Sequence, residues 1–165
     1  MKSYYEDIED KICDILCPKD ENGAKLNSIY TADPLPDNEA ENKRSFPTSK
    51  VYISCVGSDF GEDENNVMVI QEETIIFEAM IRAKSRRGDS GIFAILSDIR
   101  KKLLGYKFPG CKKIIMIKSG YIDGGTQNDW NYMLSFSFRR HVVENLVEPD
   151  APLATNIEFE TKSVN

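Results

Sequence analysis

The chain has 165 residues, of which 41% are hydrophobic, 29% charged and 10% aromatic, as expected of one globular domain with one buried core. This composition excludes disordered, collagen-like and disulfide-framework proteins, because each of those classes needs a more skewed one. The net charge of −6 argues against a protein that coats nucleic acid, and the single histidine, His141, deprives most acid–base and zinc chemistry of its usual residue.

No targeting signal is visible in the sequence. The first ten residues contain no positive region that leads into an apolar run, and the apolar run Ile114–Ile117 is far shorter than the ~20 residues of a membrane span. We therefore expect a protein made in the cytosol, without a membrane partner.

The four cysteines are expected to be reduced thiols, because a chain without a secretion signal stays in a reducing compartment. They stand at positions 13, 17, 55 and 111. The alternative is a zinc site that joins Cys13 and Cys17 to Cys55, Cys111 or His141. It is disfavoured because the second half of a zinc site should also come as a closely spaced pair. We predict no metal.

The first half of the chain predicts one helix and one strand, separated by a long loop. Apolar residues recur at helical spacing over 4–17, and Pro18 ends the helix. Residues 19–49 show no periodicity and are predicted to be a loop insertion, either mobile or ordered against a partner subunit. Alternation predicts a strand over 50–57, and the acidic stretch 58–66 is expected to turn the chain.

The second half begins with the longest predicted strand, within residues 67–83. One of its faces is apolar throughout, and the other is half apolar because of Ile76 and Met80, which suggests a second packed surface such as a subunit interface. A helix follows over 90–104, with an N-cap offered by Gly88-Asp89-Ser90 and Gly105 just after its end.

Two further strands are predicted over 112–122 and 130–143. The fold class is therefore α+β: an antiparallel sheet of about four strands with two amphipathic helices packed on one face, in the order α-β-β-α-β-β. Residues 1–145 form the single domain, with the insertion at about 19–49, and residues 146–165 form a C-terminal tail.

A search for catalytic chemistry finds none. His141 has no nucleophile near it in the sequence, the Gly-Asp-Ser-Gly stretch at 88–91 starts a helix, and the glycine clusters lack a Walker-type ending. We expect no catalytic residue and no cofactor, and therefore a protein that is not an enzyme.

Charge is distributed unevenly along the chain. Residues 82–140 hold 13 Lys and Arg against 4 Asp and Glu, a net of +9, and the remainder has a net of −15. Such a basic segment either contacts phosphates or meets the acidic part of an identical neighbour, and the large acidic remainder favours the neighbour. The candidate subunit or partner contacts are Ile76, Met80, Arg82, Lys84, Arg86, Arg87, Arg100, Lys101 and Lys102.

The order of elements resembles that of small tail proteins of tailed phages. The motifs that carry the resemblance are the helix end Ile99-Arg100-Lys101-Lys102-Leu103-Leu104-Gly105, the turn Phe108-Pro109-Gly110 and the aromatic strand 132–138. Over residues 4–145 the chain is similar to Mu-like prophage tail proteins, which are related in fold to the tail terminator of phage lambda.

The resemblance implies a homo-hexameric ring that caps the tail tube in the host cytosol and becomes part of the virion. Its implied partners are copies of itself, tail-tube or sheath subunits and head-completion or neck proteins, with DNA contacted only in the tube lumen. The strand faces and the loops at 57–68 and 123–129 would then contribute ring and tube contacts.

The sequence thus predicts a structural virion assembly protein, a tail terminator or a neck or tail-completion component. The alternative is a nucleic-acid-binding module that uses the basic segment 82–113.

Overall fold

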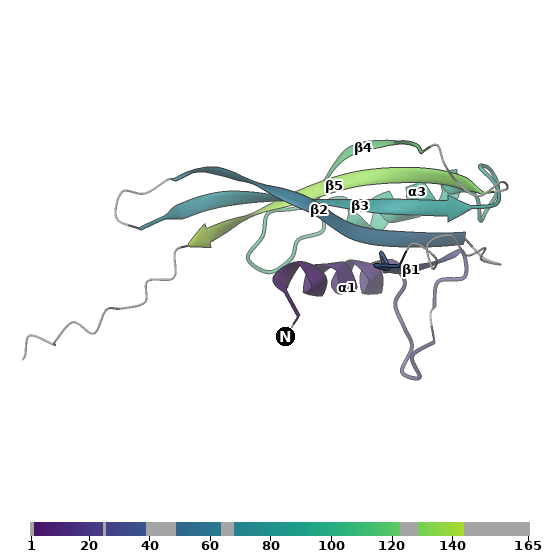
Figure 1. Ribbon diagram of the computed structural model, residues 1–165. Helices are drawn as coiled ribbons and strands as arrows, with labels where there is room; N and C mark the ends of the chain where they lie inside the picture. Colours follow the sequence, from purple (N-terminus) through teal and green to yellow (C-terminus); the bar gives the residue numbers. More distant parts are fainter. Residues whose placement is uncertain (1, 25, 39–48, 64–67, 123–128, 144–165) are drawn as a thin grey trace, which may run out of the picture.

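The computed structural model describes residues 2–24, 26–38, 49–63, 68–122 and 129–143 (Figure 1). These residues form a five-stranded sheet and two helices. The elements, in chain order, are α1 (Tyr4–Leu16), β1 (Tyr30–Pro34), β2 (Ser49–Asp63), β3 (Ile70–Ala83), α3 (Ile92–Leu103), β4 (Ile115–Tyr121) and β5 (Trp130–Val143). None of the helices in this part of the chain has the length and apolar character needed to cross a membrane.

The sheet is mixed, with the strand order β1-β2-β3-β5-β4. The three pairings among β2, β3, β5 and β4 are antiparallel, and β1 pairs with β2 in parallel. The α+β class is thus confirmed, and the four predicted strands pair antiparallel. The prediction misses a fifth, parallel strand, so the element order is α-β-β-β-α-β-β rather than α-β-β-α-β-β. The added strand lies inside the predicted loop 19–49. Two of its five residues, Tyr30 and Ala32, are buried, and Pro34 ends it. With only two inward side chains before a proline, the strand gives too weak an alternation to stand out in the sequence.

Both helices pack on one face of the sheet, as predicted. Their apolar stripes meet the inward residues of β2, β3 and β5 in one continuous core, where Phe77 stacks against Phe136 and Phe138. In α1 the predicted stripe is buried at Ile8, Ile12 and Leu16, and Ile15 is half-buried. In α3 the whole predicted stripe is buried: Ile92, Ile95, Leu96, Ile99 and Leu103. A capping box between Ser3 and Glu6 fixes the start of α1.

The start of α3 differs from the prediction. Its N-cap is Gly91, without a side-chain hydrogen bond, so residues 88–90 do not supply the cap. The amides of Ile92 and Phe93 donate instead to the carbonyls of Ser85 and Arg86, which removes the need for a side-chain acceptor. A Cβ at Gly91 would lie 2.4 Å from the Arg87 carbonyl oxygen, so this close turn requires glycine. As predicted, the helix ends just before Gly105, which adopts a left-handed backbone conformation with φ +80°.

The predicted hairpin between β2 and β3 is present, but β2 is longer than expected. It runs to Asp63, whose partner in β3 is Gln71, so most of the acidic stretch is strand rather than turn. The acidic residues can form a strand because the hydrogen bonds between paired strands join backbone groups, whatever the side chains are. Alternation of apolar and polar residues is needed only where one face of the strand is buried. Residues 64–66 of the predicted turn, residues 123–128 of the predicted loop 123–129 and the predicted tail at 146–165 lie outside the described residues.

Candidate assembly interface

One face of the sheet, which we call the open face, carries no helix within the described part of the chain. Tyr52, Met80 and Met133 lie side by side across β2, β3 and β5, and Ser54, Glu78 and Ser135 form the next row. Ile76 and Met80 are half-buried on this face, as the half-apolar pattern of β3 predicts. The Ser135 hydroxyl donates to Glu78 at 3.1 Å, so the polar row is partly paired within the chain.

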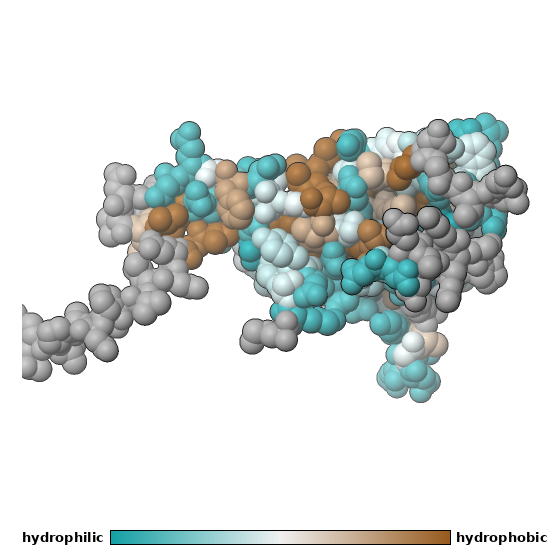
Figure 2. Space-filling model, viewed as in Figure 1, coloured by the Kyte–Doolittle hydropathy of each residue, from teal (hydrophilic) through white to brown (hydrophobic). Residues whose placement is uncertain are grey.

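Strand β4 extends this apolar surface to one edge of the sheet. Ile115 is 54% exposed and Ile117 is 50% exposed, and a register shift follows Met116. Figure 2 shows hydrophobic side chains gathered over this upper edge. Large aliphatic side chains on an exposed sheet edge are typical of a surface that meets another chain.

The predicted basic contacts do not form one continuous patch. Arg82 is buried, and Asp129 binds both Arg82, at 3.2 Å, and Lys84, at 2.6 Å. Arg86 and Arg87 are exposed in the turn before α3. The remaining three candidates lie on the last turn of α3, so the basic residues occupy two separate regions.

The three candidates on α3 have different surroundings. Arg100 donates to the Ser119 hydroxyl of β4 at 2.9 Å, and Lys101 is exposed to solvent. Lys102 points inward, where it pairs with Asp98 at 2.8 Å and donates to the Leu16 carbonyl at 2.8 Å. Lys102 is therefore a structural residue in this fold.

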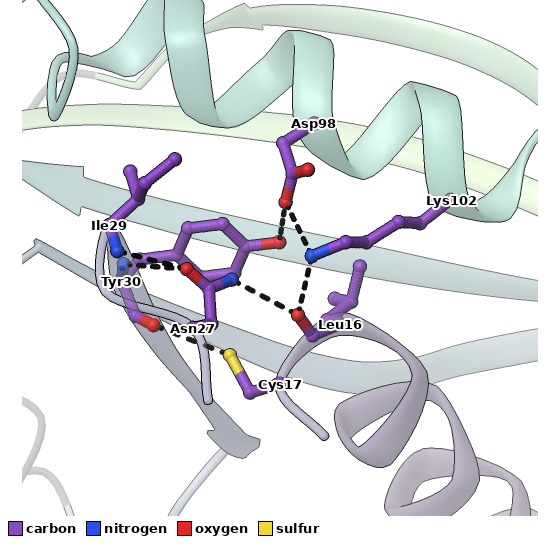
Figure 3. A network of polar contacts seen from close by, with 7 residues as sticks. All are labelled: Leu16, Cys17, Asn27, Ile29, Tyr30, Asp98 and Lys102. Atoms are coloured by element: carbon purple, nitrogen blue, oxygen red, sulfur yellow. Dashed lines mark hydrogen bonds and ion pairs between the residues drawn. The ribbon is translucent and has the colours of Figure 1, made fainter. Parts of the chain in front are cut away.

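Figure 3 shows the network to which Lys102 belongs. The buried Tyr30 hydroxyl donates to Asp98 at 2.7 Å, and the Asn27 side chain bonds the Leu16 carbonyl at 3.1 Å and the Ile29 amide at 2.9 Å. Burial and the bond to Asp98 raise the pKa of Tyr30. The network joins the end of α1 to β1 and α3.

Aromatic side chains gather around Arg86, a cluster that the sequence analysis did not identify. The Arg86 guanidinium lies 4.9 Å from the ring centre of Trp130 and 5.5 Å from that of Phe93. Tyr121 and Tyr132 complete the cluster with edge-to-face contacts at 5.9 Å. These residues come from α3, β4, β5 and the turn before α3, so no local spacing reveals them. The only sequence signal is the presence of aromatic residues at strand ends.

Part of the charge asymmetry along the chain is neutralised inside the fold. Glu72 pairs with Arg139 and Lys112, and Glu73 pairs with Arg140, so basic residues of the second half meet acids of β3. Glu73 is fully buried. Burial raises its pKa, but hydrogen bonds from Tyr5, Arg140 and Ser58 and the charge of Arg140 outweigh that effect and lower the pKa overall.

The described residues contain no group of three or more His, Cys, Asp and Glu arranged to hold a metal ion. Cys13 and Cys17 are buried thiols, and the Cys17 thiol donates to the Tyr30 carbonyl at 3.3 Å. Burial raises the pKa of the Cys13 thiol, which keeps it protonated. His141 is exposed on β5, opposite Glu72.

Comparison with known proteins places the chain in a family. No curated protein matches the sequence. Among solved structures, a chain of the "Virion of native gene transfer agent (GTA) particle" is similar over 70% of this chain and 80% of its own length, with 12% identity and a TM-score of 0.41. The family model described as "Gp37 protein" matches residues 25–161. The chain therefore belongs to the Gp37 protein family, which is phage-related.

Proposed function

We propose that this chain is a structural protein of the phage particle, a tail terminator or another neck or tail-completion component. The observation that carries the proposal is the open face, where Ile76, Met80 and Met133 are only half-buried and no helix of the described fold covers them. Membership in a phage-related family also supports a structural role in the phage particle. A surface of this kind is suited to a partner subunit rather than to a small substrate.

In this proposal, six copies form a ring at the end of the tail tube, and the open face and β4 meet tube or sheath subunits and head-completion proteins. The function requires packing and geometry, so it needs no catalytic residue and no cofactor. Assembly takes place in the host cytosol, and the protein stays in the virion.

Deletion of the gene from the phage or prophage that encodes the chain tests the proposal. We expect tails of irregular length, or tails that fail to join heads, with normal particles restored by supplying the protein in trans. Mass spectrometry of purified wild-type particles should detect the chain. Normal particles from the deletion strain, or wild-type particles that lack the chain, would contradict the proposal.

The second candidate function is nucleic-acid binding through residues 82–113. The aromatic rings beside Arg86 favour it, because bases stack on such rings. Asp129 engages Arg82 and Lys84, and Lys102 is held inside the fold, so fewer cations face solvent than the sequence suggests. Arg86→Glu with Arg87→Glu should abolish a salt-dependent shift of labelled DNA if this function holds.

A further inference from the structure

A hairpin arm projects from one end of the sheet (Figure 1). It consists of residues 56–63 of β2, and β3 pairs with the arm as far as Asp63 and Gln71. Val56 and Phe60 are 50% and 56% exposed, and Asp59 and Glu62 are exposed beside them. Figure 2 shows apolar side chains in this projecting part at the left. The arm thus presents an aromatic ring together with acidic groups.

The cluster around Arg86, here called the aromatic–arginine patch, has the complementary character. It comprises Arg86, Phe93, Tyr121, Trp130 and Tyr132. Three of its rings are well exposed: Phe93 at 43%, Tyr121 at 56% and Trp130 at 38%. No carboxylate among the described residues forms an ion pair with Arg86 or with the neighbouring Arg87. Exposed rings with an arginine at their centre are typical of protein-binding hot spots.

The arm and the patch lie at opposite ends of the sheet. Arg82, just before the patch, pairs with Lys50 at the start of β2, and the arm ends at Asp63 in the same strand. At about 3.3 Å per residue, these ends are separated by roughly 40 Å. An arm therefore cannot contact the patch of its own chain, and only a second copy can bring the two together.

We propose that the arm of one copy docks on the aromatic–arginine patch of the next copy. Phe60 packs against the exposed rings, and Glu62 pairs with Arg86 or Arg87. Asp59, which alternation places on the opposite side of the strand, adds negative charge near the two arginines. The contact is head-to-tail, so repeated copies close into a ring where the rotation permits. This inference rests on the proposed function and specifies the surfaces that join neighbouring subunits. Charge complementarity favours a second copy over DNA as the occupant, because DNA would be repelled by the acidic remainder of the chain.

Charge reversal on each side tests the contact. Asp59→Lys with Glu62→Lys gives an arm variant, and Arg86→Glu with Arg87→Glu gives a patch variant. We expect each to weaken self-association by at least about tenfold, measured by native mass spectrometry and light scattering. The protein with all four changes should associate again. Lys107→Glu with Lys113→Glu is the control, because it changes net charge as the patch variant does but lies beyond the other end of α3.

Mixing the two variants separates this contact from a symmetric one. The mixture uses neutral versions of the two variants, Asp59→Ala with Glu62→Ala and Arg86→Ala with Arg87→Ala, because a charge-reversed arm and a charge-reversed patch would attract each other. A head-to-tail interface predicts that the two neutral variants together form a dimer and no larger species, because only one competent arm and one competent patch remain. Trp130 is the chain's one tryptophan. Its emission should shift to the blue, and its quenching by acrylamide should fall, when wild-type copies associate. Circular dichroism of each variant shows that it is folded.

Wild-type rings that persist in both variants, or Trp130 emission that does not change on association, would overturn the arm contact. The same holds if single-stranded DNA, and not protein concentration, shifts the Trp130 emission. None of these results affects whether the chain is found in particles, so failure of this contact and failure of the proposed function are distinguishable.

Discussion

At the residue scale, the fully buried Glu73 is held by two elements outside its own strand. The Arg140 Nε lies 2.6 Å from its carboxylate, and the Tyr5 hydroxyl donates to it at 2.7 Å. The Arg140 guanidinium also lies 3.7 Å from the ring centre of Tyr4. A buried ion pair contributes little net stability, but removal of one partner leaves the other charge uncompensated. The cluster therefore fixes where α1 sits against β3 and β5.

Glu73→Ala should lower the free energy of unfolding by about 3 kcal/mol, because Arg140 then keeps a half-buried charge without its carboxylate. Glu72→Ala is the matched control. Glu72 also holds two cations, but Lys112 and Arg139 are about half exposed, so we expect a loss of no more than about 1 kcal/mol. Urea unfolding at neutral pH measures both. Equal losses would contradict the role given to Glu73.

The lowered pKa of Glu73 also predicts a pH dependence. A carboxyl group whose pKa is lower in the folded protein stabilises it above the unfolded value, here 4.5, and loses that contribution as pH falls toward the folded value. We expect the stability difference between wild type and Glu73→Gln to be constant above about pH 5 and to shrink at lower pH. Urea unfolding from pH 3 to 7 measures it. A difference that grows on acidification would show that the pKa is raised instead.

At the scale of elements, a residue of α3 completes the end of α1. The last turn of α1 contains no basic residue, and the Leu16 carbonyl at its end accepts hydrogen bonds from Lys102 of α3 and Asn27 of the following segment. A cation at a helix C-terminus compensates the dipole and satisfies a carbonyl that has no partner within the helix. These contacts fix the positions of α1, β1 and α3 relative to one another.

Lys102→Met should destabilise the fold by about 1–2 kcal/mol, because the Leu16 carbonyl and Asp98 each lose a charged partner. Lys101→Met is the control: Lys101 is one residue away and exposed, so we expect a change within about 0.5 kcal/mol. Thermal unfolding followed by circular dichroism compares them. If both variants unfold at the wild-type temperature, Lys102 has no structural role.

The sequence predicts those helices and strands whose own residues show a regular spacing of apolar side chains. The stripe from Ile92 to Leu103 and the alternation in Val51 and Ile53 recur over enough residues to predict α3 and the start of β2. Strand β1 and the outer part of β2 escape prediction because their pairing depends on a neighbouring strand rather than on an apolar period. The site is predicted in the same uneven way: Ile76 and Met80 follow from alternation, whereas the patch around Arg86 is assembled from residues far apart in the chain.

At the scale of the whole molecule, the two faces of the sheet differ in a way that suits an assembly protein. One face is closed by α1 and α3 over a continuous core. On the other face Tyr52, Ser135 and Ser137 are buried, and Ile76, Met80 and Met133 are half-buried. The half-buried apolar residues of the open face, together with the exposed Ile115 and Ile117 of β4, offer a surface to a partner. The arm and the patch occupy the two ends, so contacts between copies and contacts with other proteins use different surfaces.

Substitution on the open face should therefore separate folding from assembly. Ile76→Thr with Met80→Gln keeps the β-branch at position 76 and nearly the side-chain length at position 80 while making the face polar. We expect a stability loss of no more than about 1–2 kcal/mol, because both residues are only half-buried. In a complementation assay, the variant should fail to restore particles to a strain that lacks the gene. Thr74→Ser, on the same face of β3, is the control and should restore them. Full restoration by the double variant, with the protein present in the particles, would mean that the open face is not the surface that joins this chain to its partners.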